Sequence, residues 1–169
     1  MTGKDWRDGL PYRPNVGICL INSHGKIWVG KGESSGPEIV EPGREWQMPQ
    51  GGIDDDRDIV EAAKRELFEE TGARTVETLA VTEDWWTYDF PIQGEPPHKL
   101  APFCGQTQRW VLFRFTGDDS EFDISAQSVD EPAEFFEWRW ADPQTVVDRV
   151  VPFKYQQYSR VLNAFLNWL

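Results

Sequence analysis

Three glutamates near the middle of the chain have the residue type and spacing expected of a metal site. Glu66, Glu69 and Glu70 occupy positions i, i+3 and i+4, which are neighbours on one side of a helix. Each like-charged pair at this spacing costs an exposed helix about 0.2–0.5 kcal/mol, and a hard divalent cation with oxygen ligands would offset that cost. The pattern predicts Mg²⁺ binding, with Mn²⁺ as an alternative, and metal-assisted attack on phosphate. The competing interpretation is a solvated acidic helix face.

A short helix is expected to hold these glutamates in place. Asp58 can cap a helix whose third residue is Glu61, and Gly72 stands where a left-handed C-cap is needed. The predicted helix covers residues 59–71. Its apolar residues recur at helical spacing and can bury one side; they are Ile59, Ala63 and Leu67. The carboxylates would therefore project from a packed, rigid element.

Composition narrows the class of protein. With 169 residues, 39% hydrophobic residues and nine Trp, the chain is expected to form one compact domain over residues 1–169. A net charge of −12 argues against binding long duplex nucleic acid, because phosphate contacts supply most non-specific affinity. No long apolar run or signal-peptide pattern is present, so we expect a cytoplasmic protein that does not insert into membranes. Cys19 and Cys104 are expected to be reduced thiols.

The rest of the chain predicts a mixed α/β domain. Residues 15–22 and 26–31 are typical of a hairpin with His24 in its turn, and residues 76–90, 107–116 and 134–140 are expected to be further strands. Asp142 and Pro143 have the N-cap and first-position pattern of a short helix. Residues 155–169 predict a final amphipathic helix, with its apolar stripe formed by Tyr158, Val161, Leu162, Phe165 and Leu169. Strands with helices on each side predict a layered α/β/α sandwich.

Residues 51–73, GGIDDDRDIVEAAKRELFEETGA, make a more specific identification possible. Within this segment, Gly51 followed by Arg65-Glu66-Leu67-x-Glu69-Glu70-x-Gly72-Ala73 resembles the signature of the Nudix hydrolases. The resemblance implies an α/β/α sandwich with a mixed sheet, in which the signature forms a loop, a helix and a loop. It also implies metal-dependent hydrolysis of phosphoanhydride bonds in nucleotides.

One residue of the signature departs from the family. Six residues after its first Gly the family has a Glu that helps hold the signature Arg, here Arg65, whereas this chain has Arg57. Arg57 cannot accept that hydrogen bond, but Glu61 and Glu69 lie four residues to either side of Arg65 and either can replace it. The departure leaves a second hypothesis open, namely a Nudix-fold nucleotide-binding or sensing module with reduced turnover.

Further segments indicate a branch of the family. Residues 12–17, 46–53, 87–91, 105–110 and 134–140 together resemble the branch that contains bacterial RNA pyrophosphohydrolases and diadenosine tetraphosphate hydrolases. The expected substrate is thus the 5′ end of an RNA or a dinucleoside polyphosphate. Residues 32–44 look nearer the dinucleotide enzymes, whereas Phe153-Lys154 resembles the RNA-active members, so the sequence does not rank the two substrates. Oligomeric state is likewise not predicted.

The resemblance also implies roles for individual residues. Glu66, Glu69 and Glu70 are the expected metal ligands, and Glu66 is the leading candidate for activating water. Glu134 resembles a further carboxylate that binds a second ion or acts as the base, although an ordinary exposed glutamate is the alternative. The candidate substrate-binding residues are Arg13, Lys31, Tyr88, Lys99, Gln106, Arg109, Phe153 and Lys154. Phe153 could equally be a core residue, and Trp85, Trp86, Trp138 and Trp140 are assigned to the core.

Overall fold

The computed structural model describes residues 7–32, 43–53, 58–90, 103–125 and 133–169. Within these ranges the strands form one eight-stranded mixed sheet with the central order β3-β2-β1-β7-β5. Strand β1 pairs in parallel with β7, and the other pairings are antiparallel. The strands are β1 Tyr12–Ile21, β2 Ile27–Lys31, β3 Trp46–Gln47, β4 Gln50–Gly52, β5 Val76–Val81, β6 Trp86–Asp89, β7 Gly105–Phe115 and β8 Glu137–Ala141.

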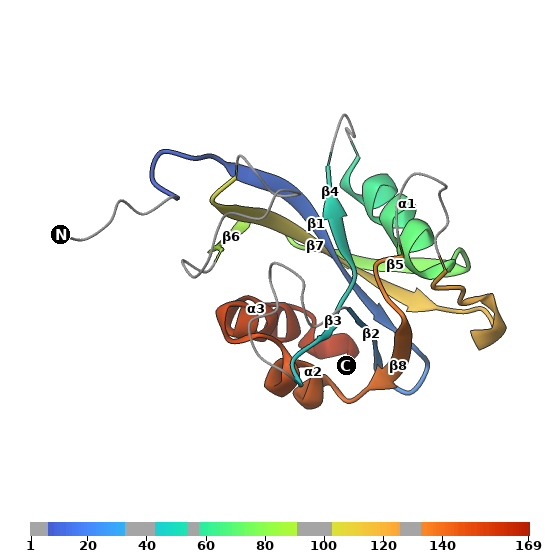
Figure 1. The fold of residues 1–169 in the computed structure, drawn as a ribbon. Coiled ribbons are helices and arrows are strands. Elements are labelled where there is room, and N and C mark those ends of the chain that lie inside the picture. The colour runs from blue at the N-terminus through green and yellow to red at the C-terminus, as the bar shows by residue number, and fades with distance from the viewer. Residues whose placement is uncertain (1–6, 33–42, 54–57, 91–102, 126–132) are drawn as a thin grey trace.

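Helices cover both faces of the sheet, as expected for an α/β/α sandwich (Figure 1). Helix α1, Ile59–Thr71, packs on one face, where its buried Leu67 joins Ile18 and Phe113 in one apolar cluster. Helices α2, Pro143–Arg149, and α3, Tyr155–Ala164, cover the other face with a second cluster. Three short 3₁₀ helices complete the fold: η1 Asp119–Glu121, η2 Pro152–Lys154 and η3 Leu166–Trp168. The predicted fold class is confirmed.

Local sequence signals determine both ends of α1. The Asp58 side chain accepts a hydrogen bond from the backbone N–H of Val60, and Gly72 adopts a left-handed conformation with φ of 80°. The N–H of Gly72 donates to the carbonyl of Phe68 at 2.8 Å. Helix α1 therefore has the bounds that its capping residues predict.

We expect Gly72→Ala to destabilise the protein by about 1–2 kcal/mol, because a side chain at positive φ is strained. An added Cβ would also lie 2.9 Å from the backbone nitrogen of Asp123. Thermal unfolding should show a melting temperature lower by about 2–8 °C. Gly72→Asn should cost less, because asparagine tolerates this conformation, and an equal loss in both variants would contradict the backbone explanation.

Three predicted elements differ from those observed. Residues 76–90 form two strands, β5 and β6, instead of one. Val81 and Trp86 are five residues apart, whereas the β7 residues that they pair with, Val111 and Gln108, are only three residues apart. The intervening residues must loop out of the sheet. The final helix ends at Ala164 and continues as η3. The strand predicted over 134–140 begins at residue 137, so Glu134 precedes β8.

One of the four tryptophans assigned to the core needs correction. Trp85 is exposed, while Trp86, Trp138 and Trp140 are partly buried against the two clusters. The fully buried tryptophans are Trp28 and Trp110. Cys19 and Cys104 are buried, free thiols, and His24 lies in the hairpin turn as predicted. None of the helices in the described ranges has the length and apolar content needed to cross a membrane.

Candidate active site

The Gly51-Gly52 pair on β4 lets two functional side chains approach the backbone from opposite faces of the sheet. A Cβ on Gly51 would lie 2.1 Å from the carboxyl carbon of Glu66, and a Cβ on Gly52 would lie 2.2 Å from Nη2 of Arg13. Successive residues of a strand point to opposite faces. Glu66 therefore covers the α1 face of β4 and Arg13 covers the α3 face. Both glycines are needed because any side chain would occupy the same space.

Glu66 is held in this position by α1 and by its neighbour. Its side chain is only 15% exposed, and its Oε1 lies 3.4 Å from Nη2 of Arg65. The same Nη2 lies 3.4 Å from the carbonyl oxygen of Gly52. Arg65 thus ties α1 to Gly52 at the end of β4, which limits the positions that the Glu66 carboxylate can take.

The structure also shows which of the two candidate glutamates on α1 pairs with Arg65. Of the two candidates, Glu69 lies within ion-pair distance, with its Oε1 4.0 Å from Nε of Arg65. Glu61 is 3.8 Å from Lys64 instead. Arg57, the departure from the family pattern, lies outside the described residues.

Glu70 is the most strongly perturbed carboxylate of the site. Burial raises its pKa well above the ordinary value, and the charges of Glu134 and Glu66, with a smaller effect of Glu69, raise it further. A hydrogen bond from the backbone N–H of Gln50 opposes this shift. Because Glu134 acts on Glu70 directly, the fold brings it to the carboxylates of α1 from 64 residues further along the chain.

Glu134 reaches the site because its neighbour is anchored in the core. Phe135 is 2% exposed, and its ring fills the space beside Gly30, where a Cβ would lie 2.5 Å from the ring. The ring also packs edge-on against Trp28 at 5.5 Å. Glu134 itself is exposed, so the buried Phe135 positions an accessible carboxylate.

These carboxylates fit a divalent cation. Oε2 of Glu70 is buried and has no hydrogen-bond partner among the described residues, which is costly for a polar atom without a ligand. Oxygen donors of this kind suit Mg²⁺ or Mn²⁺. In the described ranges, no group of three or more acidic, histidine or cysteine side chains is close enough together to hold a metal ion in this arrangement. A complete metal cage would therefore need further oxygens, which Mg²⁺ commonly takes from water and substrate phosphates.

Arg109, another predicted substrate-binding residue, faces the same side of the sheet as α1. Val16 pairs with Gly51 on one side and with Arg109 on the other, so all three residues face α1 in one row. Two strand spacings separate Arg109 from Gly51, or about 10 Å. The Nε of Arg109 donates to the carbonyl oxygen of Thr82 at 2.9 Å, which fixes the guanidinium on the β5 side of β7.

A second group of the predicted residues lies on the α3 face. Arg13 pairs with Gln106 in register, and Gln106 pairs with Tyr88, so these three side chains form a row across β1, β7 and β6. Nε2 of Gln106 lies 2.7 Å from the hydroxyl of Tyr88. The ring of Phe153, on η2, lies 5.8 Å from that of Tyr88. Phe153 and Tyr88 border a pocket of about 500 Å³ together with Tyr12, Gln156 and Arg160.

Lys154 and Lys31 occupy different surroundings. Lys154 is 1% exposed, and its Nζ lies 3.3 Å from Oε1 of Gln47 and 5.6 Å from the centre of the Tyr88 ring. The Nζ of Lys31 lies 5.7 Å from the ring centre of Phe136. Lys99 lies outside the described residues.

A buried polar network beneath the site was not anticipated from the sequence. Nε2 of Gln108 donates to Asn15 at 2.7 Å and to Gln50 at 2.9 Å, and Gln157 of α3 donates to Gln108 at 3.1 Å. These bonds connect α3, β7 and β1 to the residue that precedes Gly51. The available signal was the alternation of Gln106 and Gln108 at the start of a strand whose second half is mostly apolar.

Comparison with known proteins shows the family of this chain. The chain matches the NUDIX domain family over residues 11–161 and therefore belongs to that family. Among curated relatives, proteins named RNA pyrophosphohydrolase are 46% identical in Afipia carboxidovorans, over 94% of both chains, and 43% identical in Mesorhizobium japonicum, over 97% of this chain and 95% of that one.

Solved structures share the fold at low sequence identity. The Escherichia coli dihydroneopterin triphosphate pyrophosphohydrolase aligns with a TM-score of 0.61 and 12% identity, over 93% of this chain and 99% of that one. A Caenorhabditis elegans Ap4A hydrolase complex aligns with a TM-score of 0.58 and 17% identity, over 92% and 99% of the two chains. At such identity the likeness shows the fold alone.

Proposed function

We propose that this chain is a metal-dependent RNA pyrophosphohydrolase. In the proposed reaction, water adds to phosphorus of a 5′-triphosphorylated RNA, a phosphoanhydride bond breaks, and 5′-monophosphorylated RNA and pyrophosphate are released. The observation that carries the proposal is the buried, unpartnered oxygen of Glu70 among the charges of Glu66, Glu69 and Glu134. Relatives at 42–46% identity that bear this enzyme's name support the choice of substrate. Such a substrate would place the protein in the cytoplasm.

Glu66, Glu69, Glu70 and Glu134 would hold the cation, Mg²⁺ in the first instance. When bound, a divalent ion neutralises charge on the phosphate oxygens and lowers the pKa of water. The orphaned oxygen of Glu70 is suited to this role because coordination would satisfy it.

Glu66 is the residue that we assign to orienting the attacking water and accepting its proton. Its carboxylate is held against Gly51 by packing and near Arg65, and such pre-positioning is what general base catalysis requires. Glu134 is the alternative base because it is exposed and lies within electrostatic reach of Glu70. On the same face, Arg109 would stabilise the negative charge that develops on the phosphates.

The residues of the α3 face would bind the RNA end. Arg13, on β1 beside the edge strand β4, and Lys154 can hold phosphate oxygens, while Phe153 and Tyr88 line a pocket in which a base can stack. Such stacking is worth about 1–3 kcal/mol per base. The phosphate chain would then pass around β4, from Arg13 on one face to Glu66 on the other. Gln106, Lys31 and Lys99 are proposed as supporting contacts.

A competition assay tests the proposed substrate. One preparation receives 5′-triphosphorylated RNA and diadenosine tetraphosphate together, and the two kcat/KM values are compared because their ratio defines preference. We expect RNA to be preferred by at least about tenfold. A preference for the dinucleotide would overturn the proposal while leaving the hydrolase chemistry intact.

The binding-module hypothesis makes a different prediction. If Arg57 disabled turnover, no Mg²⁺-dependent release of pyrophosphate would be detected from any nucleotide, and Arg57→Glu would restore it. The contacts of Arg65 with Gly52, Glu66 and Glu69 favour the enzyme, because the signature arginine has partners without the missing glutamate.

Glu70→Gln should stabilise the protein when metal is absent, although it removes a proposed ligand. The raised pKa means that folded Glu70 binds its proton more tightly than unfolded Glu70, so wild-type stability falls as pH rises above the ordinary value of 4.5. Glutamine carries no charge to bury. In EDTA near pH 7.5 we expect a melting temperature about 2–4 °C higher than that of wild type, a gain of about 1 kcal/mol.

The control is the pH dependence of that gain. The difference between Glu70→Gln and wild type should shrink near pH 5, roughly where the unfolded carboxyl begins to bind its proton. Mg²⁺ should raise the melting temperature of wild type more than that of the variant. A difference independent of pH would show that the charge of Glu70 is not its source.

A further inference from the structure

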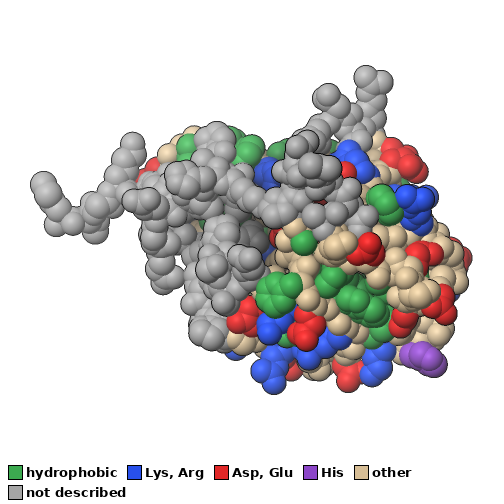
Figure 2. All heavy atoms as spheres, turned by 45° about the vertical axis from the view of Figure 1, so that its right-hand side comes forward, with side chains coloured by type: hydrophobic (Ala, Val, Ile, Leu, Met, Phe, Trp, Pro, Cys, Tyr) green, Lys and Arg blue, Asp and Glu red, His purple; other side chains and the backbone are tan. Residues whose placement is uncertain are grey.

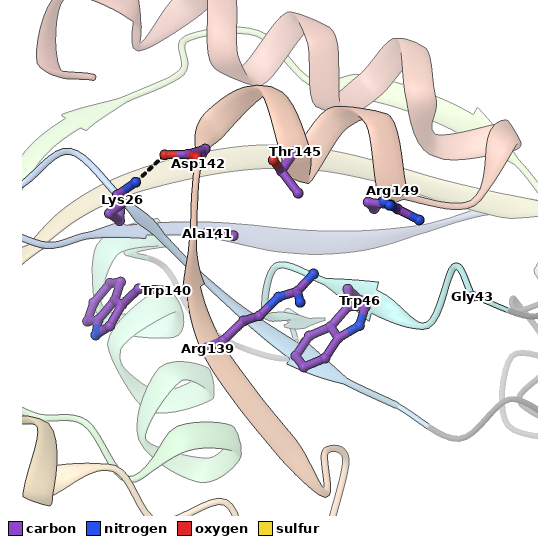
Figure 3. A pocket seen from close by; sticks show the side chains of 9 residues that line it. All are labelled: Lys26, Gly43, Trp46, Arg139, Trp140, Ala141, Asp142, Thr145 and Arg149. Carbon is purple, nitrogen blue, oxygen red and sulfur yellow. Dashed lines mark hydrogen bonds and ion pairs between the residues drawn. The ribbon is translucent and has the colours of Figure 1, made fainter.

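A pocket of about 490 Å³ lies outside the candidate active site, between β8, β3 and α2. Figure 3 shows the Arg139 side chain extending from β8 beside the Trp46 ring, with Arg149 at the end of α2 and Lys26 at the opposite side. Figure 2 shows Lys and Arg side chains, interspersed with acidic ones, along the lower part of the molecule, where α2 and β8 lie in Figure 1. The pocket therefore combines basic and aromatic groups.

The basic groups of the pocket are only partly neutralised. Lys26 forms an ion pair with Asp142, the acidic side chain that lines the pocket. The Arg139 guanidinium stacks 4.2 Å from the centre of the Trp46 ring. Within the described ranges, neither Arg139 nor Arg149 has a carboxylate partner. The chain has 29 acidic and 17 basic residues. Two arginines that line one cavity and have no carboxylate partner therefore make that cavity suited to binding an anion.

Two short connections link this pocket to the Phe153 side of the candidate active site. Trp46 is followed on β3 by Gln47, whose Oε1 lies 3.3 Å from Nζ of Lys154. Arg149 ends α2, and η2, which carries Phe153, begins three residues later. The pocket is therefore connected to Phe153 and Lys154 both through β3 and through the α2–η2 connection. A polymer bound at these two residues could extend into it.

We propose that this pocket binds the nucleotides of the RNA substrate that follow its 5′ end. This inference rests on the proposed function and specifies its substrate as a polymer. Arg139 and Arg149 bind phosphodiester oxygens, and the indole of Trp46, held by Arg139, offers an aromatic surface for a base. Local cations are needed here because the net charge of −12 repels RNA over the rest of the surface. A dinucleoside polyphosphate has no further nucleotides to occupy the pocket.

The test compares two triphosphorylated substrates, a dinucleotide and an octanucleotide, in the wild type and in the Arg139→Gln and Arg149→Gln variants. We expect each variant to raise KM for the octanucleotide about fivefold or more and to leave kinetics on the dinucleotide unchanged. Arg114→Gln is the matched control, because Arg114 lies on β7 beside Glu77 of β5 and outside the pocket. Arg114→Gln removes the same positive charge and should leave KM unchanged for both substrates.

Binding of the 5′-monophosphorylated octanucleotide, measured by fluorescence anisotropy at several salt concentrations, gives a readout independent of turnover. The slope of log affinity against log salt should become shallower by about 0.7 for each phosphate that a variant no longer neutralises. Equal effects on both substrates, an unchanged slope, or equal effects of Arg114→Gln would each overturn the pocket assignment. Wild-type protein that releases no pyrophosphate from either RNA would instead refute the proposed function, so the two failures are distinguishable.

Discussion

Glu66→Gln is expected to lower kcat for pyrophosphate release by at least about 100-fold, because the amide can neither accept a proton from water nor supply the negative charge that a cation needs. The side chain is the same size, so its packing against Gly51 is preserved. KM should change little, since Glu66 lies on the face opposite Arg13 and the proposed base pocket. Steady-state kinetics with 5′-triphosphorylated RNA and saturating Mg²⁺ measure both parameters.

Glu61→Gln is the matched control for this variant. Glu61 lies on the same helix, is exposed, and forms an ion pair with Lys64 at 3.8 Å. Its replacement should change kcat by less than about twofold, because exposed ion pairs contribute little. A loss of less than about tenfold for Glu66→Gln would remove Glu66 from the catalytic assignment and leave Glu134 as the base.

Gly51→Ala is expected to reduce kcat by about 10–100-fold without unfolding the protein. Gly51 does not have a positive φ, so alanine fits its backbone conformation. The new Cβ would, however, lie 2.1 Å from the Glu66 carboxyl carbon and would displace that carboxylate. Displacing a reacting group by about 1 Å can cost about 100-fold in rate. Turnover and thermal unfolding of the same preparation separate the two effects.

Gly52→Ala provides the comparison on the opposite face. Its Cβ would meet the guanidinium of Arg13, 2.2 Å from Nη2, which is the end of a flexible side chain. We expect KM for RNA to rise while kcat stays within about threefold of wild type, because Arg13 is assigned to binding. If both variants reduced kcat alike, the division of roles between the two faces would be wrong.

Local sequence signals predicted the parts of the site that depend on neighbours in the chain. The spacing of Glu66, Glu69 and Glu70, together with the caps at Asp58 and Gly72, was sufficient to place the carboxylates on one helix with correct bounds. These features arise from contacts within four residues. Their geometry follows from the 3.6-residue repeat of the helix alone.

Pairing register decided features that local signals do not contain. The strand predicted over 76–90 is interrupted because the chain between β5 and β6 is longer than the stretch of β7 between their pairing partners. Glu134 lies before β8, where the packing of Phe135 against Gly30 positions it. Both outcomes depend on partners that are distant in sequence, so propensity and alternation within the segment could not reveal them.

By itself, the sequence predicted the family, the fold class and the helix that carries Glu66, Glu69 and Glu70, because these follow from residue types at short, regular spacings. Only the tertiary structure decided that Glu66 and Arg13 lie on opposite faces of one edge strand, that one oxygen of Glu70 is buried without a partner, and that Arg139 and Arg149 line one pocket. The physical reason is that burial and facing direction are set by the strands and helices that pack together, which are far apart along the chain.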